Sequence, residues 1–493
     1  MEYIKISFIC FYFLILILLS CYGVHRYYLV YLYYKYKKRT PVETKPFLEL
    51  PRVTVQLPIY NEYHVVDRLI DSVCCIEYPQ ALLDIQILDD STDETRQSIV
   101  KKVAAKRKEG FDIVHIQREV RTGFKAGALD NGLRSAKGKF ILIFDADFVP
   151  EPTILQKTIH HFTNEFIGMV QIRWGHINRE YSLLTQIQSI FLDGHFMIEH
   201  FARNRSGRFF NFNGTCGIWR KKAIYDAGGW QSDTLTEDLD LSYRAQLAGW
   251  GFLYLPELVA PGELPVDLKS FKAQQYRWAK GAIQTAKKLL PAIWRSKTVP
   301  LRSKVEASFH LTDNVAYVLL LILSILFFPA LFIRLEAGIG RVLSIDVPLF
   351  LLALFSISSF YICSQKEIYG KWIDRIKYLP FLTCLGIGLC VNNARATIEA
   401  LFNIRTPFNR TPKYGVISRE DSVGEKKYYT KKSKQFLCEL ILGFYFSILV
   451  FYSLFSHQMI ILPFLILFQC GFLYTGFITL IEEKSFQKKM RIA

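Results

Sequence analysis

Five stretches of mainly apolar residues, each close to the length that crosses a membrane, lie toward the two ends of this chain. They are residues 6–24, 315–333, 347–363, 437–455 and 460–481. A helix needs about 20 apolar residues to span the hydrocarbon of a bilayer. Residues from about 45 to 300 contain no such stretch. The pattern predicts an N-terminal anchor at 1–34, a polar domain at 45–305 and a transmembrane region at 310–493.

The positive charge of the chain indicates how these segments are oriented. The formal net charge is +17, so nucleic acid has to be considered as a partner. The basic residues, however, gather beside the apolar stretches, at 35–39 and 426–434, as they do on the cytosolic flanks of membrane helices. Because this charge follows the first apolar stretch, a retained anchor is favoured over a cleaved signal peptide. We expect a multi-pass protein of the lipid bilayer with a cytosolic polar domain and no nucleic-acid partner.

A sixth apolar stretch, 379–391, is shorter and runs into polar residues. If it crossed the membrane, the basic loop 398–434 would lie on the far side, against the bias of positive charge toward the cytosol. An interfacial or re-entrant helix keeps that loop in the cytosol. The prediction is one N-terminal and four C-terminal spanning helices, plus this interfacial helix.

Strand-like and helix-like segments alternate in the polar domain. Runs rich in β-branched and aromatic residues occur at 53–57, 85–88, 113–116 and 140–144. A helical segment at 125–136 precedes the last of them. This rhythm is typical of an α/β domain whose mostly parallel sheet is covered on both faces and binds ligands at the carboxyl ends of its strands. Two amphipathic stretches, 183–201 and 266–290, are predicted to lie against the membrane and cover the site.

Carboxylates follow two of the predicted strands. Asp145 and Asp147 flank a small residue after the last strand, which suits a hard cation such as Mg²⁺ or Mn²⁺ that neutralises a diphosphate. An isolated pair of this kind is more often a turn or a cap, but the buried strand before it favours the metal. Asp89 and Asp90 follow an earlier strand and can accept hydrogen bonds from a nucleobase or a ribose. Capping of the next helix by Asp90 or Asp93 is an equally good local interpretation.

Two further motifs offer a cation and a base. Lys125 is predicted to enter a helix beside glycines, where ammonium, backbone N–H groups and helix dipole all favour a diphosphate. Asp238 follows Glu237 in an acidic turn and is our candidate to take the proton from an attacking sugar hydroxyl. Helix capping by Thr236 is the alternative for this turn, and it would orient Asp238 rather than exclude that role.

One predicted helix carries Gln274, Arg277 and Trp278, whose spacing places them on one face. Arg277 can bind a diphosphate through two parallel hydrogen bonds. Trp278 offers an apolar face on which a sugar ring can stack. A core tryptophan beside a surface arginine is the alternative when the pair is taken alone.

Together these motifs resemble those of the processive, membrane-embedded family 2 glycosyltransferases, and most closely the cellulose synthase-like glucomannan and mannan synthases. The matching stretches are 55–62, 88–93, 125–129, 144–147, 212–215, 236–238 and 274–278. The resemblance implies a GT-A-type, Rossmann-like fold. Residue by residue, it implies nucleoside binding by Asp89 and Asp90, diphosphate binding by Lys125, Asp145 and Arg277, metal binding by Asp145 and Asp147, acceptor binding by Asn213, Gly214, Thr215, Glu237, Gln274 and Trp278, and general-base catalysis by Asp238.

The resemblance also implies an activity. We expect an inverting, metal-dependent enzyme of the plasma membrane, a bacterial inner membrane or a Golgi-type membrane. It would build a β-linked glucan or mannan from UDP-glucose or GDP-mannose onto a growing glycan and pass the polymer through its helices. The loop 406–413 resembles a cytosolic segment that these enzymes place near the site. The sequence shows no cyclic-dinucleotide-binding domain after its last helix, so regulation of the bacterial cellulose synthase kind is not expected.

Two other functions are compatible with the same motifs. The first is the transfer of a single sugar to a membrane lipid without polymerisation. The second is a non-catalytic membrane transport subunit, which would need ionisable residues inside several spans. Few such residues occur, apart from Asp313 and Glu439 near segment ends, so an enzyme is favoured.

Overall fold

A seven-stranded sheet forms the centre of the polar domain in the computed structural model, which describes residues 2–41, 45–336, 343–406, 410–421 and 434–492. The strand order is β3-β2-β1-β4-β6-β5-β7. The strands are β1 (Val53–Ile59), β2 (Leu83–Asp89), β3 (Asp112–Gln117), β4 (Phe140–Ile143), β5 (Ile167–His176), β6 (Gly217–Arg220) and β7 (Gly251–Gly262). Neighbouring strands are parallel except β6, which runs antiparallel to β4 and β5.

The alternation of side chains along β1 divides the core into two layers. Val53, Val55 and Leu57 join the apolar cluster on one face of the sheet. On the other face Thr54 donates a hydrogen bond of 2.9 Å to Asp84, so this buried carboxylate of β2 is satisfied. The helices α2 (Val66–Cys74), α3 (Thr95–Lys108) and α5 (Ile154–Thr158) pack on the first face, and α4 (Phe124–Ser135), α8 (Lys221–Asp226) and α9 (Glu237–Leu247) on the second.

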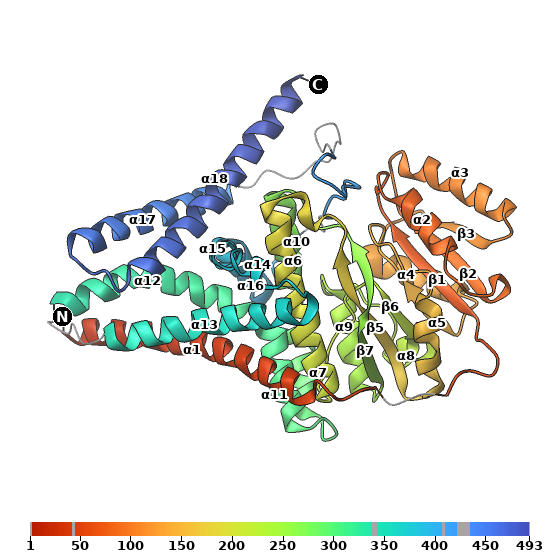
Figure 1. Ribbon diagram of the computed structural model, residues 1–493, viewed down its shortest axis with the longest axis horizontal. Helices are drawn as coiled ribbons and strands as arrows, with labels where there is room; N and C mark the ends of the chain where they lie inside the picture. Colours follow the sequence, from red (N-terminus) through yellow and green to blue (C-terminus); the bar gives the residue numbers. More distant parts are fainter. Residues whose placement is uncertain (1, 42–44, 337–342, 407–409, 422–433, 493) are drawn as a thin grey trace.

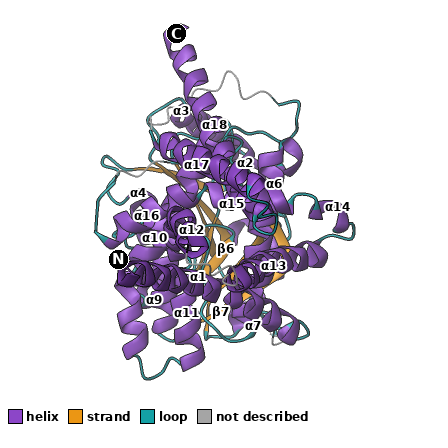
Figure 2. Cartoon of the chain, turned by 90° about the vertical axis from the view of Figure 1, so that its left-hand side faces the viewer, coloured by secondary structure: helices purple, strands orange, loops and turns teal. Residues whose placement is uncertain are grey.

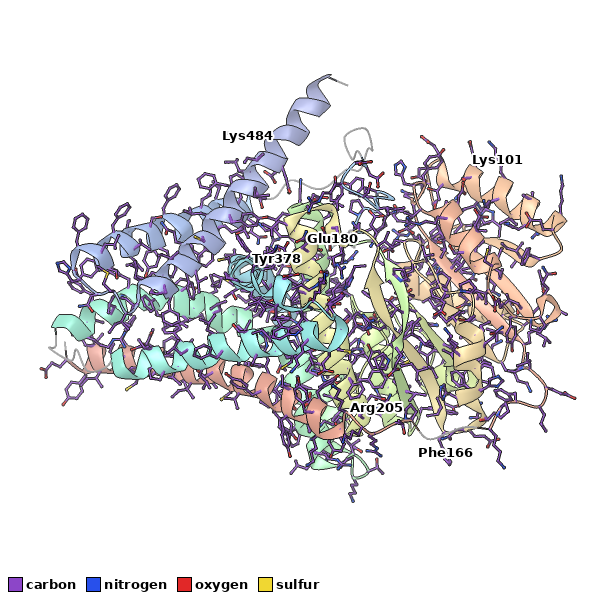
Figure 3. All side chains as sticks on the ribbon, in the orientation of Figure 1. Lys101, Phe166, Glu180, Arg205, Tyr378 and Lys484 are labelled. Carbon is purple, nitrogen blue, oxygen red and sulfur yellow. The ribbon has the colours of Figure 1, made fainter. Side chains whose placement is uncertain are left out.

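Within the part of the chain that the structure describes, five helices are long and apolar enough to cross a membrane. They are α1 (Glu2–Tyr36), α12 (Val315–Glu336), α13 (Leu343–Ile368), α17 (Gln435–Phe455) and α18 (Leu462–Ile492). They gather on one side of the molecule, with the sheet on the other (Figure 1). Viewed from the membrane side, α1, α12 and α13 lie in front of the sheet (Figure 2). Lys101, on α3, lies on the side of the domain farthest from these helices (Figure 3).

The predicted interfacial stretch is a broken helix. After the short α14 (Ile373–Ile376), α15 (Leu379–Gly388) and α16 (Cys390–Leu401) meet at an angle of 41°. This geometry fits either a broken span or a re-entrant segment. The interfacial placement of 379–391, and with it the count of five spanning helices, therefore stays a prediction.

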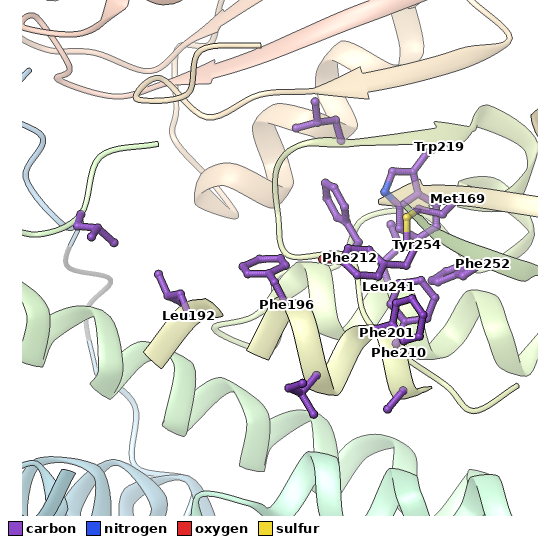
Figure 4. Close-up of a cluster of buried hydrophobic side chains, with 14 of the residues drawn as sticks. Met169, Leu192, Phe196, Phe201, Phe210, Phe212, Trp219, Leu241, Phe252 and Tyr254 are labelled. Atoms are coloured by element: carbon purple, nitrogen blue, oxygen red, sulfur yellow. The ribbon is translucent and has the colours of Figure 1, made fainter. Parts of the chain in front are cut away.

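Helices between the sheet and the membrane helices connect the two regions. α6 (Leu183–Gly194) continues through a π-helical turn, His195–His200, into α7 (Phe201–Arg205). The long α10 (Leu268–Arg295) packs against α11 (Leu301–Thr312), and Arg203 of α7 pairs with Glu306 of α11 at 2.9 Å. Two of the long apolar helices hold α10 in place: Lys272 pairs with Glu439 of α17 at 2.6 Å, and Glu482 of α18 accepts a hydrogen bond from Leu268 N at 2.9 Å. Aromatic side chains fill the space under the sheet at this junction (Figure 4).

Candidate active site

A cavity, partly open to solvent, lies at the carboxyl ends of β1, β2 and β4 beneath α10. Most of the predicted site residues line it, namely Asp90, Lys125, Asp145, Asp147, Asn213, Gly214, Glu237, Asp238, Gln274, Arg277 and Trp278.

Two predicted site residues, Asp89 and Thr215, do not line the cavity, and their part in ligand binding stays a prediction. The Asp89 carboxylate is buried, accepts a 2.8 Å hydrogen bond from Ser91 N and lies 2.8 Å from His115 Nε2. The Thr215 hydroxyl accepts a 2.9 Å hydrogen bond from Asp145 N. Successive side chains at the end of a strand point to opposite faces, so one of two adjacent aspartates must turn inward. Both residues support a neighbour instead of facing the cavity.

Asp90 lies in a pocket built by two arginines. Arg118 donates through Nε at 3.0 Å and through a terminal nitrogen at 2.5 Å, and Arg121 lies 3.6 Å away. The Arg121 guanidinium stacks over the ring of Tyr60, with 3.4 Å to the ring centroid. Tyr60 and Arg121 also line the cavity, and their flat faces suit a planar base. Neither residue is among the predicted site residues, although Tyr60 is an aromatic residue directly after β1.

Lys125 lies between a carboxylate and a carbonyl at the start of α4. Its ammonium donates to the Asp145 carboxylate and, at 2.9 Å, to Gly214 O. Burial alone would lower the pKa of Lys125, but the charge of Asp145 holds that pKa above its ordinary value. A permanent cation therefore faces the cavity at the beginning of a helix, where the dipole adds to its field.

Asp145 and Asp147 project from the end of β4, where they could face a metal. The Asp145 side chain is 34% exposed, whereas Asp147 Oδ2 accepts hydrogen bonds from Lys413 Nζ at 2.7 Å and from Glu263 N at 3.0 Å. Within the described residues no group of three or more His, Cys, Asp or Glu side chains could hold a metal. Mg²⁺ in substrate sites is commonly bound by one or two carboxylates plus phosphate oxygens, so this pair fits such an ion with a diphosphate present.

Glu237 and Asp238 are adjacent carboxylates in the first turn of α9. Asp238 Oδ1 accepts a 2.8 Å hydrogen bond from Leu239 N. Burial, and then the charge of Glu237, raise the pKa of Asp238 to about 7, although Lys125 opposes the shift. Burial also raises the pKa of Glu237. A carboxylate whose pKa lies close to the working pH is suited to accept a proton. Thr236 does not cap α9 with its side chain, contrary to the alternative interpretation of this turn.

Arg277 and Trp278 reach the cavity from α10. Arg277 donates a 2.8 Å hydrogen bond to Thr411 Oγ1. Burial lowers the pKa of Arg277 to about 10, with Glu237 opposing, so the guanidinium stays charged at neutral pH. Trp278 packs partly against the apolar cluster under the sheet and partly lines the cavity, which combines the two interpretations of this tryptophan.

A segment after α16 closes one side of the cavity. Arg410 donates to the carbonyl oxygens of Tyr60 and Asn61. The backbone N–H groups of 414 and 415 donate to the buried Glu263 carboxylate at 2.8 and 2.7 Å. The loop 406–413, expected near the site, thus lies there in its described part; residues 407–409 are outside the described residues. Glu263, Arg410 and Lys413 were not predicted, because nothing local to them indicates contact with β1 or β4.

Gly214 is the position where the backbone comes closest to the acidic pair, so we expect Gly214→Ala to be damaging. Its φ is +80°, and an added Cβ would lie 2.9 Å from Asp238 Oδ2 and 3.3 Å from Lys125 Nζ. We expect about 1–3 kcal/mol of destabilisation from the backbone strain and, in addition, a loss of transfer activity.

Gly249→Ala is the matched control for this substitution. Gly249 has a φ of +94° and nothing within 4 Å of the added Cβ. Gly249→Ala should therefore lower the thermal unfolding temperature through backbone strain, with little loss of activity. Equal activity losses in the two variants would contradict close packing at Gly214.

The mixed sheet, the carboxylates at its edge and the cationic groups around one cavity define a glycosyltransferase of the GT-A type. Residues 51–281 match the family model described as "Glycosyltransferase like family 2". The solved structure of the mannosyltransferase PcManGT from Pyrobaculum calidifontis, in complex with GDP-Man and Mn²⁺, superposes with a TM-score of 0.51 at 19% identity, covering 79% of this chain and 99% of that one. At this identity the likeness concerns the fold alone.

Two curated relatives indicate the branch of the family to which the chain belongs. Glucomannan 4-beta-mannosyltransferase 7 of Arabidopsis thaliana is 31% identical over 87% of this chain and 76% of its own length. Glucomannan 4-beta-mannosyltransferase 2 of the same plant is 43% identical over a match that covers 52% of this chain and 49% of that relative. The chain belongs to glycosyltransferase family 2, in its cellulose synthase-like branch, and is a hexosyltransferase.

Proposed function

We propose that the protein polymerises a β-linked glycan of the mannan or glucan type from a nucleotide sugar at the cytosolic face of a membrane and passes the product across. The observation that supports this best is the placement of Asp238 in the same cavity as Lys125 and Arg277. A base and a cationic site for a leaving diphosphate are what a single displacement at an anomeric carbon requires. GDP-mannose is the first candidate donor, because the relatives are named as mannosyltransferases; UDP-glucose is the second.

The chain's own side chains account for the proposed reaction. Asp238 takes the proton from an acceptor hydroxyl, and the oxygen attacks the anomeric carbon with inversion. Lys125 and Arg277 stabilise the charge that develops on the departing nucleoside diphosphate. Asp90, with Tyr60 and Arg121, holds the nucleoside, and Trp278, Gln274, Glu237, Asn213 and Gly214 form the acceptor side. Asp145 and Asp147 would hold Mg²⁺ or Mn²⁺, whose charge would offset that of the diphosphate.

The raised pKa of Asp238 predicts a pH profile. The base must be ionised, so activity should be present above its pKa of about 7 and be lost as the pH falls through that value. We expect kcat/KM to fall about tenfold for each pH unit below the midpoint. Glu237→Gln removes a neighbouring negative charge and should move the midpoint to lower pH. A flat profile between pH 5 and 8 in both proteins would contradict the role of Asp238.

A donor screen with product sizing tests the proposed activity. Membranes containing the protein would be supplied with labelled GDP-mannose, UDP-glucose or UDP-N-acetylglucosamine and with Mg²⁺, Mn²⁺ or a chelator. We expect a glycan of many residues from one donor, lost on chelation and recovered when the metal is returned. If only one sugar per acceptor is added with every donor, the enzyme is not a polymerase.

A second candidate, transfer of one sugar to a membrane lipid, is favoured by one observation. A mainly apolar cavity lies among α1, α6, α12, α13, α15 and α18, lined by residues such as Leu19, Phe191, Leu320 and Phe468. Its lining would suit acyl chains. A single glycolipid product in the same assay would select this function.

The proposed arrangement in the membrane follows the charge and the helices. We assign residues 1–34 to an anchor, 45–305 to a cytosolic domain and 310–493 to the transmembrane region, with the loop 398–434 in the cytosol. Part of that loop, 422–433, lies outside the described residues. Cysteine labelling from each side of sealed vesicles would test the orientation, with Cys75 as an exposed reporter on the domain.

A further inference from the structure

A π-helical turn beside the cavity places a histidine against a predicted acceptor residue. Such turns are rare and often occur at functional sites. Phe196, in this turn, is fully buried in the aromatic cluster under the sheet, 5.1 Å between ring centroids from Trp174 (Figure 4). The preceding residue, His195, is half-buried, and its Nε2 lies 3.0 Å from Nδ2 of Asn213.

The other nitrogen of His195 fixes the tautomer. Nδ1 lies 2.9 Å from Oε2 of Glu199, one turn later. Burial acts to raise the pKa of Glu199, but Arg203 at 3.3 Å and His195 hold it well below its ordinary range. An ionised carboxylate only accepts hydrogen bonds, so Nδ1 carries the hydrogen, and Nε2 faces an amide nitrogen, which only donates. Nε2 therefore accepts from the Asn213 amide NH₂ group, which sets the rotation of that amide.

The rotation leaves the amide oxygen of Asn213 directed away from the histidine. Among the described residues, no donor lies within hydrogen-bonding distance of this oxygen, which is buried. The Asn213 side chain lines the cavity, and the next residue, Gly214, approaches Asp238 so closely that a Cβ there would lie 2.9 Å from Oδ2. A sugar whose hydroxyl meets Asp238 would thus pass beside an acceptor atom that has no protein partner.

We propose that Glu199 and His195 are positioning residues that hold the Asn213 amide with its oxygen toward the acceptor. This inference rests on the proposed transfer to a sugar hydroxyl. The amide oxygen accepts a hydrogen bond from a second hydroxyl of the acceptor sugar, and so selects acceptors that carry it. A site built to bind a hydroxyl discriminates against an analogue without it, because its own polar group is left unpaired. Without His195 the amide is free to rotate, so the hydrogen bond to that hydroxyl is no longer held in place and the discrimination weakens.

Acceptor analogues lacking one hydroxyl test this proposal. A β-mannosyl trisaccharide and the set of analogues deoxygenated at single positions of its terminal sugar would be supplied with GDP-mannose. We expect one analogue to raise the acceptor KM of the wild type about tenfold, as the loss of one hydrogen bond in a buried site does. In His195→Leu the KM for the full trisaccharide should rise by a similar factor, and the penalty for that analogue should disappear.

Further variants separate positioning from a general loss of structure. His195→Gln offers an amide oxygen in place of Nε2 and should restore discrimination. Glu199→Gln, made in case His195→Leu does not fold, should reduce discrimination because its amide can donate to Nδ1. Release of nucleoside diphosphate to water in the absence of acceptor should stay unchanged in each variant. His457→Leu, at an exposed position at the end of α17, is the control and should behave as wild type.

The outcomes distinguish this inference from the proposed function. A full penalty for the deoxy analogue in His195→Leu, or no penalty for any analogue in the wild type, would overturn the role of the Glu199–His195 pair. A wild type that releases no nucleotide from any nucleotide sugar would instead count against the proposed glycosyltransfer itself.

Discussion

Replacing Asp238 with asparagine is expected to abolish sugar transfer while leaving donor binding measurable. The amide keeps the shape of the side chain and an oxygen for the hydrogen bond from Leu239 N, but it cannot take the proton of the attacking hydroxyl. General-base catalysis contributes about 10²–10⁴-fold to a rate, so the loss should be at least of this order. Transfer would be measured with labelled donor, and donor affinity by equilibrium binding to purified protein.

Asp233→Asn is the control for this substitution. Asp233 lies in the same acidic turn but is exposed, and it pairs with Lys288 at 2.8 Å. Exposed ion pairs contribute little, so this variant should keep wild-type activity. Transfer at the wild-type rate by Asp238→Asn would mean that another group accepts the proton.

Lys125→Met is expected to lower kcat by about 10²–10³-fold, the cost of removing one charged donor from a site where negative charge develops. The ammonium lies between Asp145 and Gly214 O, at the start of α4. Its loss also leaves the Asp145 carboxylate without this cation, so donor affinity should fall as well. Single-turnover rates and donor binding, measured separately, would divide the two effects.

Lys221→Met is a matched control for the second substitution. Lys221 begins α8 and donates a 2.7 Å hydrogen bond to Ala136 O, yet it does not line the cavity. It should lower stability slightly without changing kcat. If both lysine variants lose activity equally, the effect of Lys125 is one of folding and not of charge at the diphosphate.

The elements of the first half of the domain could be predicted because their signals are local. Each of the four expected strands appears within a few residues of its predicted place, and the helix expected at 125–136 is α4 at Phe124–Ser135. Strands β5, β6 and β7 were not predicted. The four residues of β6 run antiparallel between β4 and β5. The sequence of so short a strand indicates neither its direction nor which strands it pairs with.

The candidate site was less predictable, because a side chain's role depends on where its neighbours lie. Asp89 and Asp90 are adjacent and chemically identical, yet only Asp90 faces the cavity. Arg410 contacts the backbone of Tyr60, 350 positions away, and Lys413 contacts Asp147, 266 positions away. Nothing in the basic loop itself distinguishes these two cations from those that flank the membrane.

The sequence by itself determined which segments are apolar enough for a membrane, where strands and helices alternate, and which carboxylates and cations stand at the ends of strands. These properties follow from periodicity and composition within some 20 residues, so they are independent of the rest of the fold. Only the tertiary structure decided which of those groups share a cavity, which are turned into the core, and which distant residues close the site. Such contacts depend on the summed directions of several hundred backbone bonds, and the raised pKa of Asp238 exists only after folding has buried it beside Glu237.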